Sequence, residues 1–141
     1  MNPDLTPADF AAVTEEFFRL NNLADLQFHD GETALGFIYE SDDMVELFVK
    51  SFAARNSEIP PLLIYHFASA LGEAYRLIFN GSWVYKEKNE RWVVEFTMPK
   101  GEIMAANVFY KVENRFLNGD EDSLVYMFES LKAMYLGQLE L

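Results

Sequence analysis

Residues 60–79, with the sequence PPLLIYHFASALGEAYRLIF, decide the fold. Proline is tolerated in the first turn of a helix, so Pro60-Pro61 can open one here. The apolar residues that follow surround most of the helical circumference, which is typical of a helix covered by other elements on several sides. We therefore expect a long central helix over about 60–79 that forms the spine of the core.

Beyond this helix, the apolar pattern changes from a helical period to a period of two around Trp83 and Trp92. With residues 87–90 as the loop, Tyr85 faces Trp92 and Trp83 faces Val94 in an antiparallel hairpin. A slip of one residue would place the two tryptophans on opposite faces, so burial fixes the register. The rings that share one face are Trp83, Tyr85, Trp92 and Phe96.

On the N-terminal side of the central helix, apolar residues recur at helical spacing over about 7–21 and again from Thr33 to Ala54. Ser41-Asp42-Asp43 offers an N-cap in the middle of the second stretch. We therefore expect one helix over about 7–21 and two more, over about 31–40 and 42–55.

On the C-terminal side, the segment 102–117 fits either a third strand or a helix, and we favour a helix from about 104. Asp120 can cap a last helix over about 121–136. The sequence thus predicts a single α+β domain over residues 1–141. It combines N-terminal helices, a long central helix, an aromatic antiparallel hairpin packed on that helix, and C-terminal helices.

The charge is strongly acidic, with 23 Asp and Glu against 11 Lys and Arg and a net charge of -12. Residues 1–60 carry most of it, with 12 acids and 3 bases. Such a field repels phosphate backbones and anionic lipid surfaces, so we expect neither nucleic acid nor a membrane as a partner. No basic and apolar leader and no membrane-spanning stretch is visible, and cysteine is absent, so we expect a cytoplasmic protein.

The residue types that carry common enzyme chemistry are sparse. The two histidines, His29 and His66, are too few for a typical zinc site, and no Gly-x-Ser-x-Gly elbow precedes Ser69. Glycine-rich nucleotide cradles are also absent. We therefore expect no metal, no cofactor and no enzymatic activity.

Glu73 lies in the most apolar helix, where a carboxylate is costly unless it is paired. Arg76, one turn later, and the indole N–H of Trp83 are the partners that we expect. The alternative is an acid with a raised pKa in a pocket between the central helix and the hairpin. His66, Glu73 and Tyr75 would be the polar groups of that pocket.

Several short motifs stand in the second half of the chain. They are Leu71-Gly72-Glu73 with Arg76, Gly81-Ser82-Trp83, Trp92-Val93-Val94, and Asn118-Gly119-Asp120-Glu121-Asp122-Ser123-Leu124. This pattern resembles a small bacterial family of unknown function. The resemblance implies an α+β domain without an established activity, in a family with members suspected to lie near toxin and immunity systems. It supplies no catalytic residue.

Two functional hypotheses follow. The first is a non-enzymatic binding protein, such as an immunity-type inhibitor, that presents acidic side chains to a basic protein partner. The acids of this proposed surface are Asp30, Glu32, Glu40, Asp42, Asp43 and Glu46. The second is a small-molecule binder or weak enzyme that uses the pocket described above. A homodimer through exposed aromatic surface is compatible with either.

Overall fold

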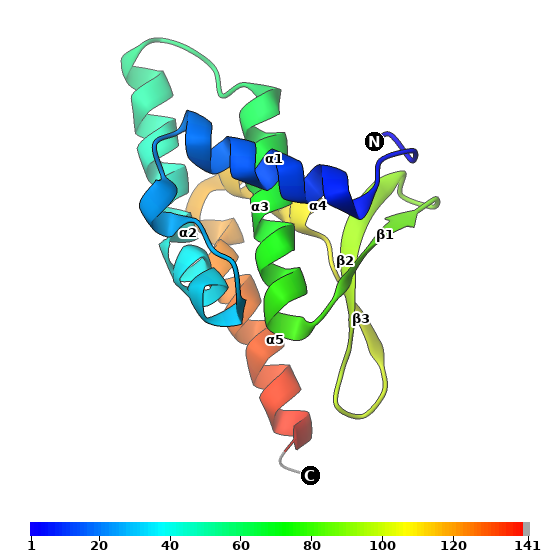
Figure 1. Ribbon diagram of the computed structural model, residues 1–141. Coiled ribbons are helices and arrows are strands. Elements are labelled where there is room, and N and C mark those ends of the chain that lie inside the picture. The colour runs from blue at the N-terminus through cyan, green and yellow to red at the C-terminus, as the bar shows by residue number, and fades with distance from the viewer. Residues whose placement is uncertain (140–141) are drawn as a thin grey trace.

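The computed structural model describes residues 1–139 and has the expected α+β architecture (Figure 1). The helices are α1 (Pro7–Leu20), α2 (Gly31–Ala54), α3 (Pro61–Phe79), α4 (Val108–Asn118) and α5 (Leu124–Leu139). The strands are β1 (Ser82–Lys86), β2 (Arg91–Thr97) and β3 (Ile103–Ala106), and the short 3-10 turns are η1 (Ala24–Leu26) and η2 (Gly119–Asp122).

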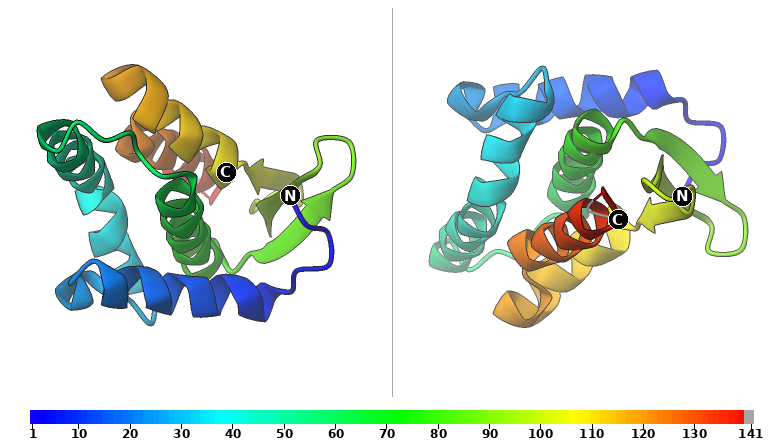
Figure 2. Two further views of the ribbon diagram at one scale, coloured as in Figure 1. Left: turned by 90° about the horizontal axis from the view of Figure 1, so that it is seen from above. Right: turned by 90° about the horizontal axis from the view of Figure 1, so that it is seen from below.

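Helix α3 is the centre of the molecule, as its apolar circumference predicts. Helices α1, α2 and α4 and the sheet all contact it, and Figure 2 shows α3 with α2 on one side and the strands on the opposite side, while α1 runs across a third side. Every residue from Phe67 to Tyr75 is buried. The prediction of a central helix over 60–79 is therefore confirmed.

The hairpin has the predicted register, with Tyr85 opposite Trp92 and Trp83 opposite Val94. The Trp83 ring stacks on Phe10 of α1, with 4.0 Å between the ring centroids. It also lies directly on the backbone of α3, because a Cβ atom added to Gly72 would stand 2.0 Å from the ring. Glycine at position 72 is what allows this approach.

The segment whose structure the sequence left open contains both a strand and a helix. β3 pairs antiparallel with β2, and the sheet has the order β1-β2-β3. The side chain of Asn107 then accepts a hydrogen bond from the backbone N–H of Tyr110 at 3.4 Å, and α4 begins. Only four residues of strand precede the turn into the helix, so the period of two is too short to stand out.

The predicted break in the second helical stretch is wrong, because α2 is continuous over Gly31–Ala54. The Ser41 hydroxyl is buried and donates to the Ile38 carbonyl oxygen at 2.5 Å, so it does not cap a new helix. The predicted start of the last helix is also wrong. Residues 119–122 form the turn η2, and Ser123, not Asp120, accepts from the backbone N–H of Tyr126 at 3.1 Å.

Candidate functional site

The six acids expected to form one binding surface divide into two groups in the structure. Asp42 belongs to the first group, because both of its carboxylate oxygens accept hydrogen bonds from the start of α5. The Ser123 hydroxyl donates at 2.6 Å, and the backbone N–H groups of Leu124 and Val125 donate at 2.9 and 3.1 Å. A residue in the middle of α2 therefore caps a helix that begins more than eighty residues later.

Arg115 of α4 forms ion pairs with Asp42 and with two further acids. Its side chain is only 1% exposed, and its Nε atom donates to Asp42 at 2.8 Å. Its Nη2 atom donates to Glu46 at 2.9 Å and to Asp120 at 3.3 Å. This Arg115 cluster, defined here as Asp42, Glu46, Arg115 and Asp120, joins α2, α4 and η2. Its arginine is buried, whereas the carboxylate of Asp120 is exposed.

The protonation of Asp42 reflects these contacts. Burial by itself raises the pKa of this carboxyl. The hydrogen bonds from Ser123, Leu124, Arg115 and Val125 outweigh burial and hold the pKa below its ordinary value. The carboxylate is therefore charged at neutral pH, as an ion pair with Arg115 requires.

Asp30 also has a role inside the fold, because it is the N-cap of α2. Its carboxylate accepts from the backbone N–H of Thr33 at 2.8 Å, and hydrogen bonds from Thr33 lower the pKa of Asp30. Three of the six predicted surface acids therefore make contacts within the fold. Asp30 and Asp42 cap helices, and Asp42 and Glu46 form ion pairs with Arg115.

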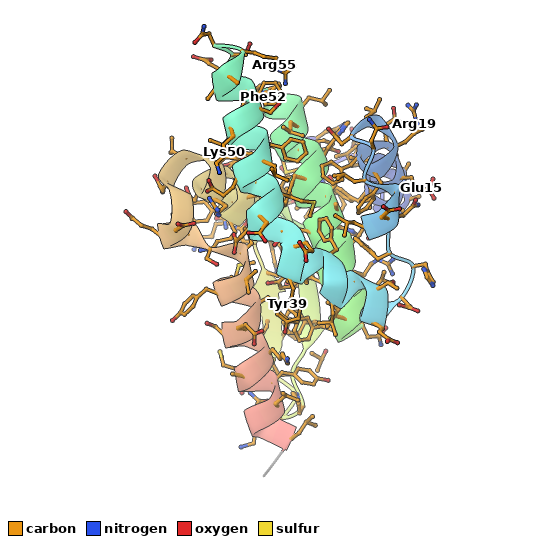
Figure 3. The ribbon with its side chains drawn as sticks, turned by 90° about the vertical axis from the view of Figure 1, so that its left-hand side faces the viewer. Glu15, Arg19, Tyr39, Lys50, Phe52 and Arg55 are labelled. Carbon is orange, nitrogen blue, oxygen red and sulfur yellow. The ribbon has the colours of Figure 1, made fainter. Side chains whose placement is uncertain are left out.

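Glu32, Glu40 and Asp43 form the second group, and all three are exposed. At about 100° per residue, their spacing places them on one outward stripe of α2, which we call the acidic stripe. None of the ion pairs found among residues 1–139 involves them. Lys50 and Arg55, the cations nearest in sequence, lie toward the far end of the helix (Figure 3).

An apolar groove of about 340 Å³ adjoins the acidic stripe, between α2 and the end of α1. Its lining residues are Asn21, Leu23, Met44, Leu47, Phe48 and Ser51. Leu47 continues the helical spacing of the stripe and is 67% exposed. Charge and an open apolar hollow therefore occur side by side on α2.

The expected pairing of Glu73 is confirmed. Its carboxylate accepts from Arg76 Nε at 2.8 Å and from the Trp83 indole Nε1 at 2.9 Å. This carboxylate thus joins α3 to β1, in the space that the alternative hypothesis assigned to a ligand. The Trp83 ring occupies that space.

The other two residues of the alternative pocket lie elsewhere. Tyr75 points toward α5, where its ring centroid is 5.8 Å from that of Phe128. Burial raises the pKa of Tyr75, and among the described residues its hydroxyl has no hydrogen-bond partner. His66 lies on the α1 side. Partial burial lowers the pKa of His66, and the Glu16 carboxylate opposes that shift. The structure therefore does not bring His66, Glu73 and Tyr75 to one cavity.

Sequence reasoning missed Arg115, although a signal for it exists. The buried positions of α4 are Val108, Phe109, Val112 and Arg115, at the spacing of one helical face. An arginine in the place of a core residue indicates a buried ion pair, and its partners must then be found among the acids of other elements.

Comparisons with family models, curated proteins and solved structures find no match for this chain. The family resemblance stays a prediction. Among residues 1–139, no helix is long and apolar enough to cross a lipid bilayer. Within the same residues, no group of three or more His, Asp or Glu side chains is placed to hold a metal ion.

Proposed function

We propose that this protein is a non-enzymatic binding protein that docks a basic protein partner on the outward face of α2. The observation that carries the proposal is the acidic stripe, Glu32, Glu40 and Asp43, beside the apolar groove at Leu47. Exposed like charges on one helix repel one another, so a cationic partner gains the interaction that the fold does not supply.

The two parts of this face contribute differently to binding. Charges at the rim of an interface increase the rate of association and its dependence on salt. Binding energy comes mainly from a few large side chains that enter a hollow and lose their water. We expect the partner to place an apolar or aromatic side chain in the groove while its Lys or Arg residues face the acidic stripe.

The mechanism in this proposal is occlusion, as in an immunity-type inhibitor that covers a basic active surface. It needs no catalytic group, metal or cofactor, and the cytoplasm is the compartment that we propose. The alternative of a small-molecule pocket between α3 and the hairpin gains no support from the packing, because Trp83 lies on Gly72 there.

The proposal is tested by affinity capture from native lysate with three forms of the protein. The first is the wild type, and the second is Glu32→Gln/Glu40→Gln/Asp43→Asn. The third is a control of equal charge change on other exposed acids, Glu87→Gln/Glu90→Gln/Glu121→Gln. We expect a basic protein to be retained by the wild type and the control, and to be lost with the stripe variant.

Two further measurements sharpen the result. The association rate of the captured protein should fall by about tenfold or more between low and high salt, as for steered complexes. Leu47→Glu should raise the dissociation rate. Capture of the same proteins by the stripe variant and the wild type, or an association rate indifferent to salt, would overturn the proposal.

A further inference from the structure

Helix α5 is unusual in this fold because it is apolar round much of its circumference and yet lies largely at the surface. Only Leu124 and Phe128 are fully buried. By contrast, α3 is also apolar on most sides and is covered along its whole central part. A helix that is hydrophobic all round is normally covered, so α5 lacks part of its cover in the isolated chain.

The exposed large apolar side chains are concentrated in the same part of the chain. Within residues 103–139 they are Ile103, Tyr110, Leu117, Tyr126, Met134, Leu136 and Leu139. Tyr110 and Leu117 share one face of α4, seven residues apart. Figure 1 shows the C-terminal half of α5 extending below the body of the molecule, next to the loop between β2 and β3.

A groove of about 420 Å³ opens beside these side chains, between the end of β3, the start of α4 and α5. Its apolar and small lining residues include Ala105, Ala106, Met127 and Leu131, and the rings of Tyr110 and Tyr126 stand at it. Phe128 and Lys132, on another side of α5, approach Tyr39 of α2. The groove is therefore separated from the face that contacts α2.

From this geometry we infer that a second copy of the chain covers the α5 face, in a two-fold symmetric dimer. In this dimer, Tyr126 of each copy enters the groove of the other. The face has both parts that such an arrangement needs, since Tyr126 is 74% exposed and projects beside a hollow. A cavity of about 150 Å³ accepts a benzene ring, so this groove has room for a phenol ring.

The available area agrees with a dimer. Tyr110, Leu117, Tyr126 and Met134 are 56%, 80%, 74% and 50% exposed. If each such side chain offers about 150–200 Å² when free, they expose about 450 Å² together. A stable interface buries about 800 Å² per partner, of which about 60% is apolar. These four side chains alone therefore supply nearly the whole apolar part.

The charge distribution favours a copy of this chain on this face over the acidic face of residues 1–60. Residues 1–60 carry 12 acids and 3 bases, and two such regions would repel each other. Residues 103–139 carry 5 acids and 3 bases, and Arg115 is already paired with acids inside the fold. Repulsion between two copies is therefore much weaker over residues 103–139 than over residues 1–60, and residues 103–139 also hold most of the exposed large apolar side chains.

The inference is tested by light scattering and sedimentation at about 100 μM protein, far above a micromolar dissociation constant. We expect twice the chain mass of 16.3 kDa for the wild type. Tyr126→Glu, which removes the inserted ring, and Ser130→Trp, which fills the groove without adding charge, should each weaken the dimer at least tenfold. Both positions are exposed, so circular dichroism should show unchanged folding.

Leu47→Glu is the matched control, because it adds the same charge at an exposed leucine on α2. It should leave the dimer intact and impair only the docking proposed for α2, whereas Tyr126→Glu should do the opposite. A monomeric wild type at this concentration would overturn the inference, as would a dimer that survives both Tyr126→Glu and Ser130→Trp. Neither result bears on the α2 proposal.

Discussion

Two acids of the Arg115 cluster, Asp42 and Glu46, lie on the same helix as the acidic stripe, and the two sets of acids have opposite roles. Asp42 and Asp43 are neighbours in sequence but lie about 100° apart around α2. Asp42 turns toward α4 and α5 and accepts four hydrogen bonds from side chains and backbone. Asp43 turns outward and is exposed. An aspartate on the inner side of α2 stabilises the fold, whereas an aspartate on its outer side is available to a partner. The direction in which the residue faces therefore matters more than its chemistry.

Among the tests of this comparison, we expect the largest loss of stability when Arg115 is replaced. Arg115→Met keeps the volume of the side chain but leaves Asp42 and Glu46 without their cation. We expect the free energy of unfolding to fall by about 3 kcal/mol, measured by urea denaturation. Arg91→Met is the matched control, since the Arg91–Glu113 pair is partly exposed and should contribute less than about 1 kcal/mol. Equal losses in the two variants would contradict a special role for the Arg115 cluster.

A smaller effect should separate the two neighbouring aspartates. Asp42→Asn replaces one acceptor oxygen by an NH₂ group that faces two donors, so we expect a loss of about 2 kcal/mol. Asp43→Asn should change the free energy of unfolding by no more than about 0.5 kcal/mol. A loss of similar size at both positions would mean that net charge, not the hydrogen bonds of α5, explains the effect.

The difference between wild type and Asp42→Asn should also depend on pH. The folded-state pKa of Asp42 lies below its unfolded value, which is about 3.9 for an ordinary aspartate. The stabilisation is therefore fully present above that pH and is lost as the pH falls through the folded pKa. Urea titrations at a series of pH values from neutral downward should show the two proteins converging in acid, and a constant difference would contradict the assignment.

The smallest effect, of opposite sign, is expected in the acidic stripe. Glu40 and Asp43 lie one turn apart and repel each other, so Glu40→Gln/Asp43→Asn should stabilise the fold by at most about 0.5 kcal/mol at low salt. The gain should vanish in about 1 M salt, where the Debye length is about 3 Å. Thermal unfolding at both salt concentrations measures this, and destabilisation would show that the stripe has a structural role.

The sequence predicted the hairpin register and the partners of Glu73 correctly, because in each case one local rule was enough to choose between the alternatives. Two facing rows of aromatic residues with a period of two fixed the hairpin register. The cost of burying a carboxylate in an apolar helix was enough to pair Glu73 with Arg76 and Trp83. In both cases the partners lie within a short stretch of chain, so spacing alone could identify them.

Prediction from the sequence failed where a residue with a recognisable local pattern makes its contacts with an element far away in the chain. Ser41-Asp42-Asp43 has the composition of an N-cap, and Asp42 is indeed a cap, but for α5 and not for its own helix. The same distance explains why Asp42 and Glu46, two of the six proposed surface acids, are occupied by contacts within the chain. A count of charges along the sequence cannot distinguish an acid that meets Arg115 from one that meets solvent.

The bond between Asp42 and the start of α5 also bears on the order in which the molecule is assembled. A ribosome makes α2 before α5, so the carboxylate exists long before the amides of Leu124 and Val125 that it caps. Until those residues emerge, α2 carries an unmatched charge on its inner side, and α5 lacks that cap until it reaches α2. The nascent chain can therefore close this contact, and complete this part of the fold, only after the start of α5 has been synthesised.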